Sequence, residues 1–322
     1  MKVLIIGAGV VGSIFGWALT RGWHEVTHLV RPGRAVQFAN GMPVDVIDRR
    51  PHHPEHVQEI YPICARESIS PAERFDLVII PTKHYTLEQT LQQIAPFTRG
   101  TDTLLLTQNW QGTQQIDQWL DPAKYSFGDA KAGGSFLDER LVCTIKAIDI
   151  GSRSGKTDDC LQKCISLFQS AQITTHVQDD MLYYLWVQYA YTAGPWPMLV
   201  RAGSFKKLYS DRQSSKLILA AIQESLQVVR ARGVDLERFP DLQMYLHPSK
   251  LTGLLVSIAL SWMFAHDEYR KRCSLHALAD PQEVRTFYFD VLNSGHELHV
   301  PMPVLDSFRE DMLAFTQPGS AW

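Results

Sequence analysis

The sequence has few cysteines, little net charge and no long uninterrupted apolar run. Its 322 residues include five cysteines, an odd number, and none forms a Cys-x-x-Cys pair. We therefore expect reduced thiols rather than disulfides or a metal centre. The formal net charge of −3 is too small to predict binding to nucleic acid or to an anionic membrane.

The apolar segments are too short or too interrupted to predict a membrane span. Glycines interrupt the segment at the N-terminus, so we expect no secretory signal peptide. The longest later stretch, LTGLLVSIALSWMFA at 251–265, predicts a buried helix. Together these features favour a cytoplasmic protein, and the hydrophobic content of 45% predicts a packed globular core.

Strand-like and helix-like segments alternate in the first half of the chain. Helices are predicted at 13–21 and 87–94, and strands at 3–6, 25–30, 77–80, 104–106 and 143–150. This alternation predicts an α/β fold with a doubly wound parallel sheet.

Strand-like runs nearly disappear after residue 178. Helices are predicted there at 181–191, 214–232, 250–264, 281–298 and 304–314. We therefore predict two domains, with the sheet in residues 1–178 and an all-helical substrate or dimerisation domain in residues 179–322. A ligand is expected in the cleft between them.

The chain opens with MKVLIIGAGVVG, an apolar strand that ends in a G-x-G-x-x-G motif. A helix and a second strand follow, which is the context that dinucleotide binding requires. The first glycine allows a sharp turn, the second lets a pyrophosphate approach the backbone, and the third lets the helix pack closely on the strand. A glycine-rich turn without a ligand is the alternative. The residues expected to contact the cofactor here are Gly7, Ala8, Gly9, Val10, Val11 and Gly12.

The residues after the second strand bear on which cofactor is bound. An NAD site usually has an acidic residue there that binds the ribose hydroxyls, but this chain reads THLVRPGR. Arg31 stands at the acidic position and Arg34 follows it. Because a guanidinium matches a phosphate as a bidentate partner, these residues favour NADP(H). Ordinary solvated arginines are the alternative.

Three segments of the first half resemble the ketopantoate reductase (2-dehydropantoate 2-reductase) family: GAGVVGSIFGWALTRGWHEVTHLVRPGR, DLVIIPTKHYTLEQTL and LLLTQNWQG. The spacing from Glu283 to VPMP at 300–303 is also similar. The resemblance implies an N-terminal Rossmann domain, a helical C-terminal domain, NADPH as cofactor and reduction of a 2-oxo acid to a 2-hydroxy acid.

Three side chains are candidates for the substrate end of such a site. Lys83 and Asn109 each follow a predicted strand, at the edge of the sheet where ligands bind. Lys83 offers a charge to a carboxylate or phosphate, and Asn109 a hydrogen bond to ribose or substrate. A solvated lysine and a turn-forming asparagine are the alternatives. By resemblance Glu283 binds a substrate hydroxyl, although it also suits the first turn of a helix.

The sequence departs from the family at the catalytic position. Family members have a catalytic lysine in a Trp-x-Lys pattern, whereas Gln188 follows Trp186 here. Glutamine donates a hydrogen bond but not a proton, so another group would have to act as the acid. The candidate replacements, each of which also suits an ordinary structural position, are Tyr189, Tyr191, His276 and Lys131.

These features leave three functions open. The leading hypothesis is an NADPH-dependent reductase of a small 2-oxo acid. The alternatives are a non-catalytic NADP-binding sensor or interaction protein, favoured by Gln188, and an opine- or imine-type dehydrogenase. We also expect a homodimer.

Two charged segments are interpreted as surface. The residues Arg270, Lys271 and Arg272 suit a solvated helix face. The run RRPHHPEH at 49–56 has prolines and no paired carboxylate, which favours a surface loop over a metal site.

Overall fold

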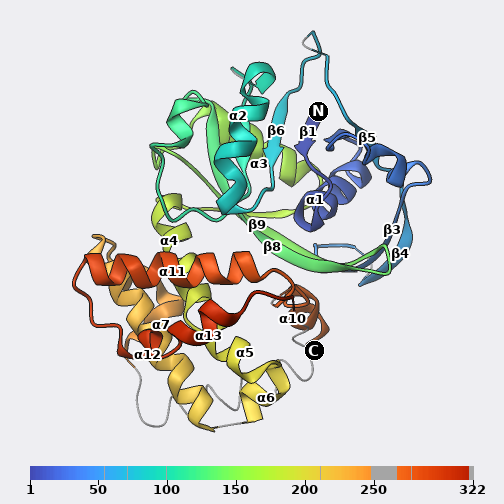
Figure 1. The fold of residues 1–322 in the computed structure, drawn as a ribbon. Coiled ribbons are helices and arrows are strands. Elements are labelled where there is room, and N and C mark those ends of the chain that lie inside the picture. The colour runs from blue at the N-terminus through green and yellow to red at the C-terminus, as the bar shows by residue number, and fades with distance from the viewer. Residues whose placement is uncertain are drawn as a thin grey trace. The chain divides into compact units, whose positions relative to one another are not determined.

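The computed structural model describes residues 1–53, 55–70, 72–98, 100–210, 212–247, 267–276 and 278–318. The chain divides into two compact units, Met1–Tyr184 and Leu185–Trp322 (Figure 1). The apolar helix predicted at 250–264 lies outside the described residues. Within the described segments, no helix combines the length and apolarity needed to cross a membrane.

The first unit is built on a ten-stranded sheet of order β4-β3-β9-β8-β7-β6-β1-β2-β5, with β10 paired to β9. The strands are β1 (Lys2–Ile6), β2 (Glu25–Leu29), β3 (Met42–Asp48), β4 (His56–Tyr61), β5 (Cys64–Arg66), β6 (Leu77–Ile80), β7 (Thr103–Leu105), β8 (Tyr125–Leu137), β9 (Arg140–Ser152) and β10 (Thr174–Val177).

The part of this sheet from β5 to β8 is entirely parallel. It contains the predicted strands β1, β2, β6 and β7, so the predicted α/β fold is confirmed. The sheet as a whole is mixed, because β3 pairs with β4 and β8 with β9 in antiparallel fashion. Only Asp138 and Glu139 separate β8 from β9, with φ values of 47° and 64°. A two-residue turn with positive φ at both positions joins antiparallel strands.

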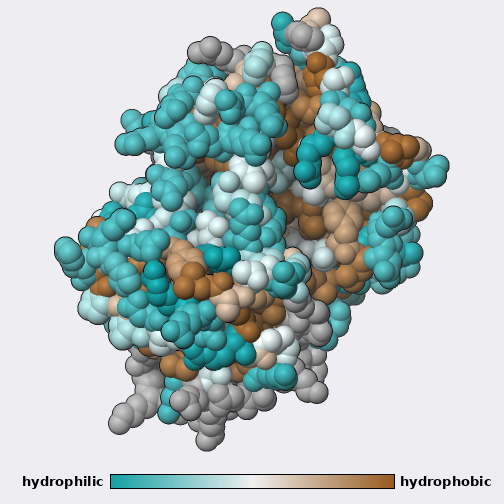
Figure 2. Space-filling model, in the orientation of Figure 1, coloured by the Kyte–Doolittle hydropathy of each residue, from teal (hydrophilic) through white to brown (hydrophobic). Residues whose placement is uncertain are grey.

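Three helices cover this sheet: α1 (Val10–Arg21), α2 (Leu87–Thr98) and α3 (Asp159–Ser170). The residues of α1 from Gly12 to Leu19 are buried, and Phe15 packs edge-on against Phe168 of α3 with ring centroids 5.6 Å apart. Figure 2 shows that apolar surface gathers on the side of the unit that carries β3 and β4. Ile60 of β4 is 55% exposed.

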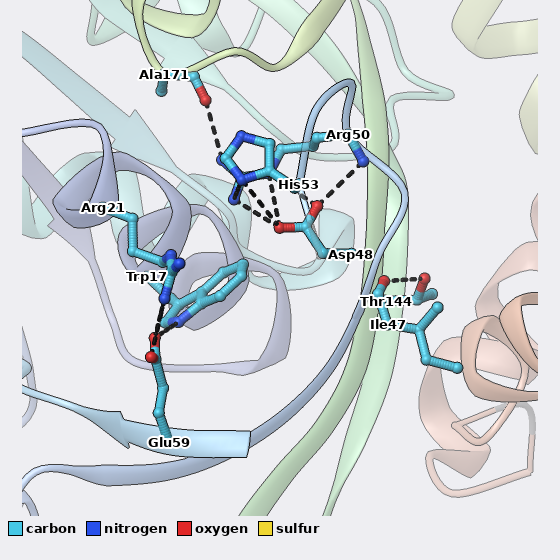
Figure 3. Close-up of polar contacts among 9 residues, drawn as sticks. All are labelled: Trp17, Arg21, Ile47, Asp48, Arg50, His53, Glu59, Thr144 and Ala171. Atoms are coloured by element: carbon cyan, nitrogen blue, oxygen red, sulfur yellow. Dashed lines mark hydrogen bonds and ion pairs between the residues drawn. The ribbon is translucent and has the colours of Figure 1, made fainter. Parts of the chain in front are cut away.

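The segment 49–56 lies mainly at the surface, as predicted, because all but one of its described residues are exposed or half-buried. The exception is Arg50, which is only 3% exposed. Its guanidinium pairs with Asp48 at 2.7 Å, donates to the carbonyl oxygen of Ala171 at 2.9 Å and lies over the ring of Trp17 (Figure 3). The arginine is buried because each of these contacts replaces one with water.

The described residues of the second unit form helices and connecting loops, with no strand among them. Its helices are α4 (Met181–Ala193), which begins in the first unit, α5 (Trp196–Ala202), α6 (Phe205–Ser210), α7 (Arg212–Ala231), α8 (Gln243–Leu246), α10 (Glu268–Cys273), α11 (Pro281–Glu297), α12 (Pro303–Asp306) and α13 (Arg309–Ala314). The predicted helices at 181–191, 214–232 and 281–298 are confirmed. The one predicted at 304–314 is two short helices, α12 and α13. Glu224 of α7 accepts hydrogen bonds from the backbone N–H groups of Val304 and Leu305 and so holds the start of α12.

Candidate functional site

A cavity of about 800 Å³ lies in the first unit, at the carboxyl ends of β1, β2 and β5. In an α/β sheet this edge is where ligands bind. The described lining comes from the glycine turn, the segment after β2, the segment after β5, positions between 82 and 94 before and along α2, and one residue of β8. The lining residues are Ile6, Gly7, Ala8, Gly9, Leu29, Val30, Arg31, Pro32, Arg34, Phe38, Glu67, Ser68, Ile69, Thr82, Thr86, Gln89, Thr90, Gln93, Ile94 and Phe136.

The three motif glycines have separate physical roles. Gly7 has a φ of +90°, a conformation that a side chain disfavours, and its N–H bonds to the Leu29 carbonyl at 2.7 Å. A Cβ on Gly12 would lie 2.9 Å from Cγ of Pro81 and 3.2 Å from Cγ2 of Ile5, so Gly12 allows α1 to pack on the sheet. A Cβ on Gly9 would have no neighbour within 4 Å, because this glycine borders the cavity.

The N-terminus of α1 is suited to bind an anion. Gly9 is its N-cap residue, no side chain caps the helix, and its first turn contains no acidic residue. The backbone N–H groups of Val10, Val11 and Gly12 lie in this first turn, where they have no partner within the helix. Together with the helix dipole they provide a site for a phosphate.

His28 is a residue of the site that the sequence did not reveal. It lies on β2, is fully buried, and its ring nitrogens bond to the carbonyl oxygen of Gly7 and to the hydroxyl of Tyr61. Burial lowers the pKa of His28 to about 4, although the bond to Gly7 opposes the shift. The sequence shows only a histidine within a short predicted strand, which does not identify its partners.

Arg31 and Arg34 lie on the turn after β2, and both are exposed at the rim of the cavity. The N–H of Arg34 bonds to the carbonyl oxygen of Arg31 at 3.1 Å. Glu67, which follows β5, lines the same cavity. No sequence motif points to it, because only the pairing of β5 with β2 brings it to this edge.

Lys83 and Asn109 follow β6 and β7. Lys83 is exposed and immediately precedes the short helix His84–Thr86. Asn109 is 5% exposed, and its side-chain amide both donates to and accepts from the backbone of Gly112. It therefore shapes the loop after β7, and it retains one N–H and one lone pair for a ligand. Neither residue is among the described residues that line the cavity.

Lys131 lies in a cluster of ionisable groups in the first unit. Its ammonium group lies 2.6 Å from Asp129, 3.1 Å from Asp149 and 2.7 Å from the hydroxyl of Tyr184. Gln108, next to Asn109, also bonds to Asp129. The carboxylates raise the pKa of Lys131 despite its burial, while burial raises the pKa of Asp129. Lys131 is therefore a firmly protonated cation held by two carboxylates.

Two of the candidate acids in the second unit are bonded within its interior. The hydroxyl of Tyr189 donates to Asp290 at 2.6 Å, and burial raises the pKa of Tyr189 far above its usual value. The hydroxyls of Tyr191 and Tyr245 lie 2.7 Å apart. Tyr189 is buried and Tyr191 is half-buried, and both hydroxyls have the partners that structural tyrosines have.

The remaining predicted positions lie on or beside helices of the second unit. Gln188 is half-buried on α4. Glu283 is in the first turn of α11, where its N–H bonds to the capping residue Asp280. His276 follows α10 and is half-buried. On α10 itself, Lys271 pairs with Glu268 at 2.8 Å. The described residues contain no group of three or more side chains that could hold a metal.

Sequence comparison relates the first part of the chain to a known family. Residues 3–123 match the family model described as ketopantoate reductase PanE/ApbA. The 2-dehydropantoate 2-reductase of Pyrococcus abyssi is 24% identical over 191 residues, which span 58% of this chain and 60% of that protein. The match therefore covers less than two thirds of that relative. The Aquifex aeolicus 2-dehydropantoate 2-reductase is 25% identical over 247 residues, which span 71% of this chain and 72% of that protein.

Solved structures share the fold over nearly the whole chain. A 2-dehydropantoate 2-reductase from Geobacter metallireducens superposes with a TM-score of 0.75 at 17% identity, covering 98% of this chain and 100% of that one. A D-mandelate dehydrogenase with NADH and anilino(oxo)acetate superposes with a TM-score of 0.73 at 16% identity, covering 98% of both chains. At these identities the likeness establishes the fold.

Proposed function

We propose that the chain is a divergent member of the ketopantoate reductase family and that it is an NADPH-dependent reductase of a small 2-oxo acid. The observation that carries the proposal is the cavity at the glycine turn, with two guanidinium groups at its rim. Two relatives are named 2-dehydropantoate 2-reductase, and this supports reduction of a 2-oxo acid as the class of reaction.

The described residues fit the phosphates of NADPH. The backbone of Gly7, Ala8 and Gly9 and the uncapped start of α1 would bind the pyrophosphate. Arg31 and Arg34 would bind the 2′-phosphate as charge-assisted partners. When bound, the nicotinamide supplies the hydride for carbonyl reduction.

The protein has to stabilise the charge that develops on the carbonyl oxygen, and such donors contribute about 10²–10⁴-fold in rate. Gln188 would donate a hydrogen bond to this oxygen, and Asn109 and Glu283 would orient the substrate. Lys83 would attract the carboxylate of the 2-oxo acid. Tyr189 and Tyr191 are bonded within the second unit, and the raised pKa of Lys131 makes its ammonium group a weak acid. Solvent is therefore the better source of the proton.

Ketopantoate is one of several possible 2-oxo acids. The replacement of lysine by Gln188 and the D-mandelate dehydrogenase neighbour both support testing aromatic 2-oxo acids beside it. The test is to follow NADPH oxidation with ketopantoate, benzoylformate and pyruvate, each with and without added amino acids. Turnover that requires an amino acid would instead identify an opine- or imine-forming dehydrogenase.

A non-catalytic NADPH sensor is the second candidate, and Gln188 is the observation that favours it. Tight NADPH binding without turnover on any of these acids would support it over the reductase. The variant Gln188→Lys separates the two further. If this variant gains ketopantoate reduction, the protein has the scaffold of a reductase and differs from the family only in the side chain that donates the proton.

A further inference from the structure

Glu67 stands beside the two arginines at the carboxyl edge of the sheet. Strand β5 pairs in parallel with β2, and Arg66 is opposite Leu29 in the register. Glu67 is the next residue after β5, so it lies next to the start of the turn that carries Arg31 and Arg34. All three residues line the same cavity.

The carboxylate of Glu67 holds the backbone of this turn. Its Oε1 accepts the N–H of Ala35 at 2.9 Å. Hydrogen bonds from the backbone of Ala35, Gly33 and Arg34 keep the pKa of Glu67 below its ordinary value. Because the anion is the better acceptor, the ionised form holds the turn.

This arrangement bears on the choice between NADPH and NADH. A carboxylate at the rim of a dinucleotide site favours NAD when it accepts the two ribose hydroxyls. Here Oε1 of Glu67 instead accepts the backbone N–H of Ala35, and the turn presents two guanidinium groups. The carboxylate therefore fixes the backbone from which Arg31 and Arg34 project.

Building on the function proposed above, we propose that Glu67 is a specificity-determining residue that positions Arg31 and Arg34 for the 2′-phosphate of NADPH. Without the carboxylate, the segment from Gly33 to Ala35 loses its anchor, and ordering the arginines on binding costs additional conformational entropy. This cost weakens binding of the 2′-phosphate, which the arginines contact. Binding of the rest of the nucleotide is not affected.

The experiment measures dissociation constants of NADPH and NADH for the full-length chain and for Glu67→Gln and Glu67→Ala. We expect the constant for NADPH to rise about tenfold in both variants and that for NADH to change less than about twofold. Adenosine 2′,5′-bisphosphate and AMP, as fragments with and without the 2′-phosphate, should show the same contrast. Glu297→Gln removes an exposed carboxylate of the second unit and serves as the matched control.

The unchanged constant for NADH is the internal measure of an intact fold, because loss of structure would weaken both nucleotides. An unchanged ratio of the two constants in the Glu67 variants would overturn the proposal. So would tighter NADPH binding, which would mean that the carboxylate repels the phosphate. If the unsubstituted protein binds neither nucleotide, the proposed function itself fails, and this inference fails with it.

Discussion

The ring nitrogen Nδ1 of His28 lies 2.9 Å from the carbonyl oxygen of Gly7. A carbonyl oxygen only accepts, so Nδ1 carries the proton, and Nε2 accepts from the hydroxyl of Tyr61 at 3.0 Å. A neutral histidine on β2 therefore holds the glycine turn that follows β1.

This bond predicts a pH dependence of stability. The pKa of His28 is about 4 in the folded chain and about 6.5 when unfolded. Between these values the unfolded chain binds the proton and the folded chain does not, so the free energy of unfolding falls as the pH falls from about 6.5 to 4. The full difference corresponds to on the order of 3 kcal/mol.

Urea unfolding at about pH 7 and about pH 4.5 measures this contribution. The proteins to compare are the unsubstituted chain, His28→Asn and His52→Asn. We expect the loss of stability on acidification to be smaller in His28→Asn. His52 is exposed, and its substitution should leave the loss unchanged. Equal losses in all three proteins would show that His28 does not carry the effect.

Gly9 and Gly12 should respond differently to a single added methyl group. Gly9→Ala should change stability by less than about 1 kcal/mol, because its φ of −75° suits alanine and only the N-cap preference is lost. Its methyl group should weaken NADPH binding at least about tenfold by obstructing the pyrophosphate. Gly12→Ala should cost about 1–3 kcal/mol through overpacking against Pro81 and Ile5. Thermal unfolding and nucleotide titration of both variants measure the contrast, and an equal loss of stability would contradict it.

Lys131→Met should leave Asp129 and Asp149 close together without their cation. Removing one partner of a buried ion pair costs about 3–5 kcal/mol, and we expect about 3 kcal/mol because the side chain of Lys131 is 32% exposed. Protonation relieves the repulsion between the carboxylates, so the loss should be smaller at acidic than at alkaline pH. Denaturant unfolding across this range tests the trend, with Lys146→Met, at an exposed lysine of β9, as control. A loss that does not vary with pH would argue against the charge effect.

The elements predicted from the sequence are those with strong local patterns. Strands β1 and β6 are continuous apolar runs, and α1 has helical periodicity followed by Gly22. Strands β3 and β4 were missed, although MPVDVID and HVQEIY alternate in the manner of half-exposed strands. Strand β8 contains three glycines, which lower its propensity to form a strand. It is stabilised by its long antiparallel pairing with β9, which the local sequence does not reveal.

The residues of the candidate site likewise fall into those that local sequence predicts and those that depend on distant partners. The positions of Gly7, Gly9 and Arg31 at the cavity could be predicted because they follow from position along one strand–turn–helix unit. The roles of His28 and Glu67 depend on partners from other strands, Tyr61 for the first and the β5–β2 pairing for the second. The burial of Arg50 likewise requires Trp17 and Ala171, which are distant in the sequence.

Isothermal titration calorimetry of the full-length protein with NADPH and NADH tests the nucleotide site most directly. We expect saturable binding of one NADPH per chain that is tighter than binding of NADH, and loss of this preference in Arg31→Ala. The absence of binding heat with both nucleotides at several temperatures would contradict the assignment of the glycine turn, α1 and the two arginines to a dinucleotide.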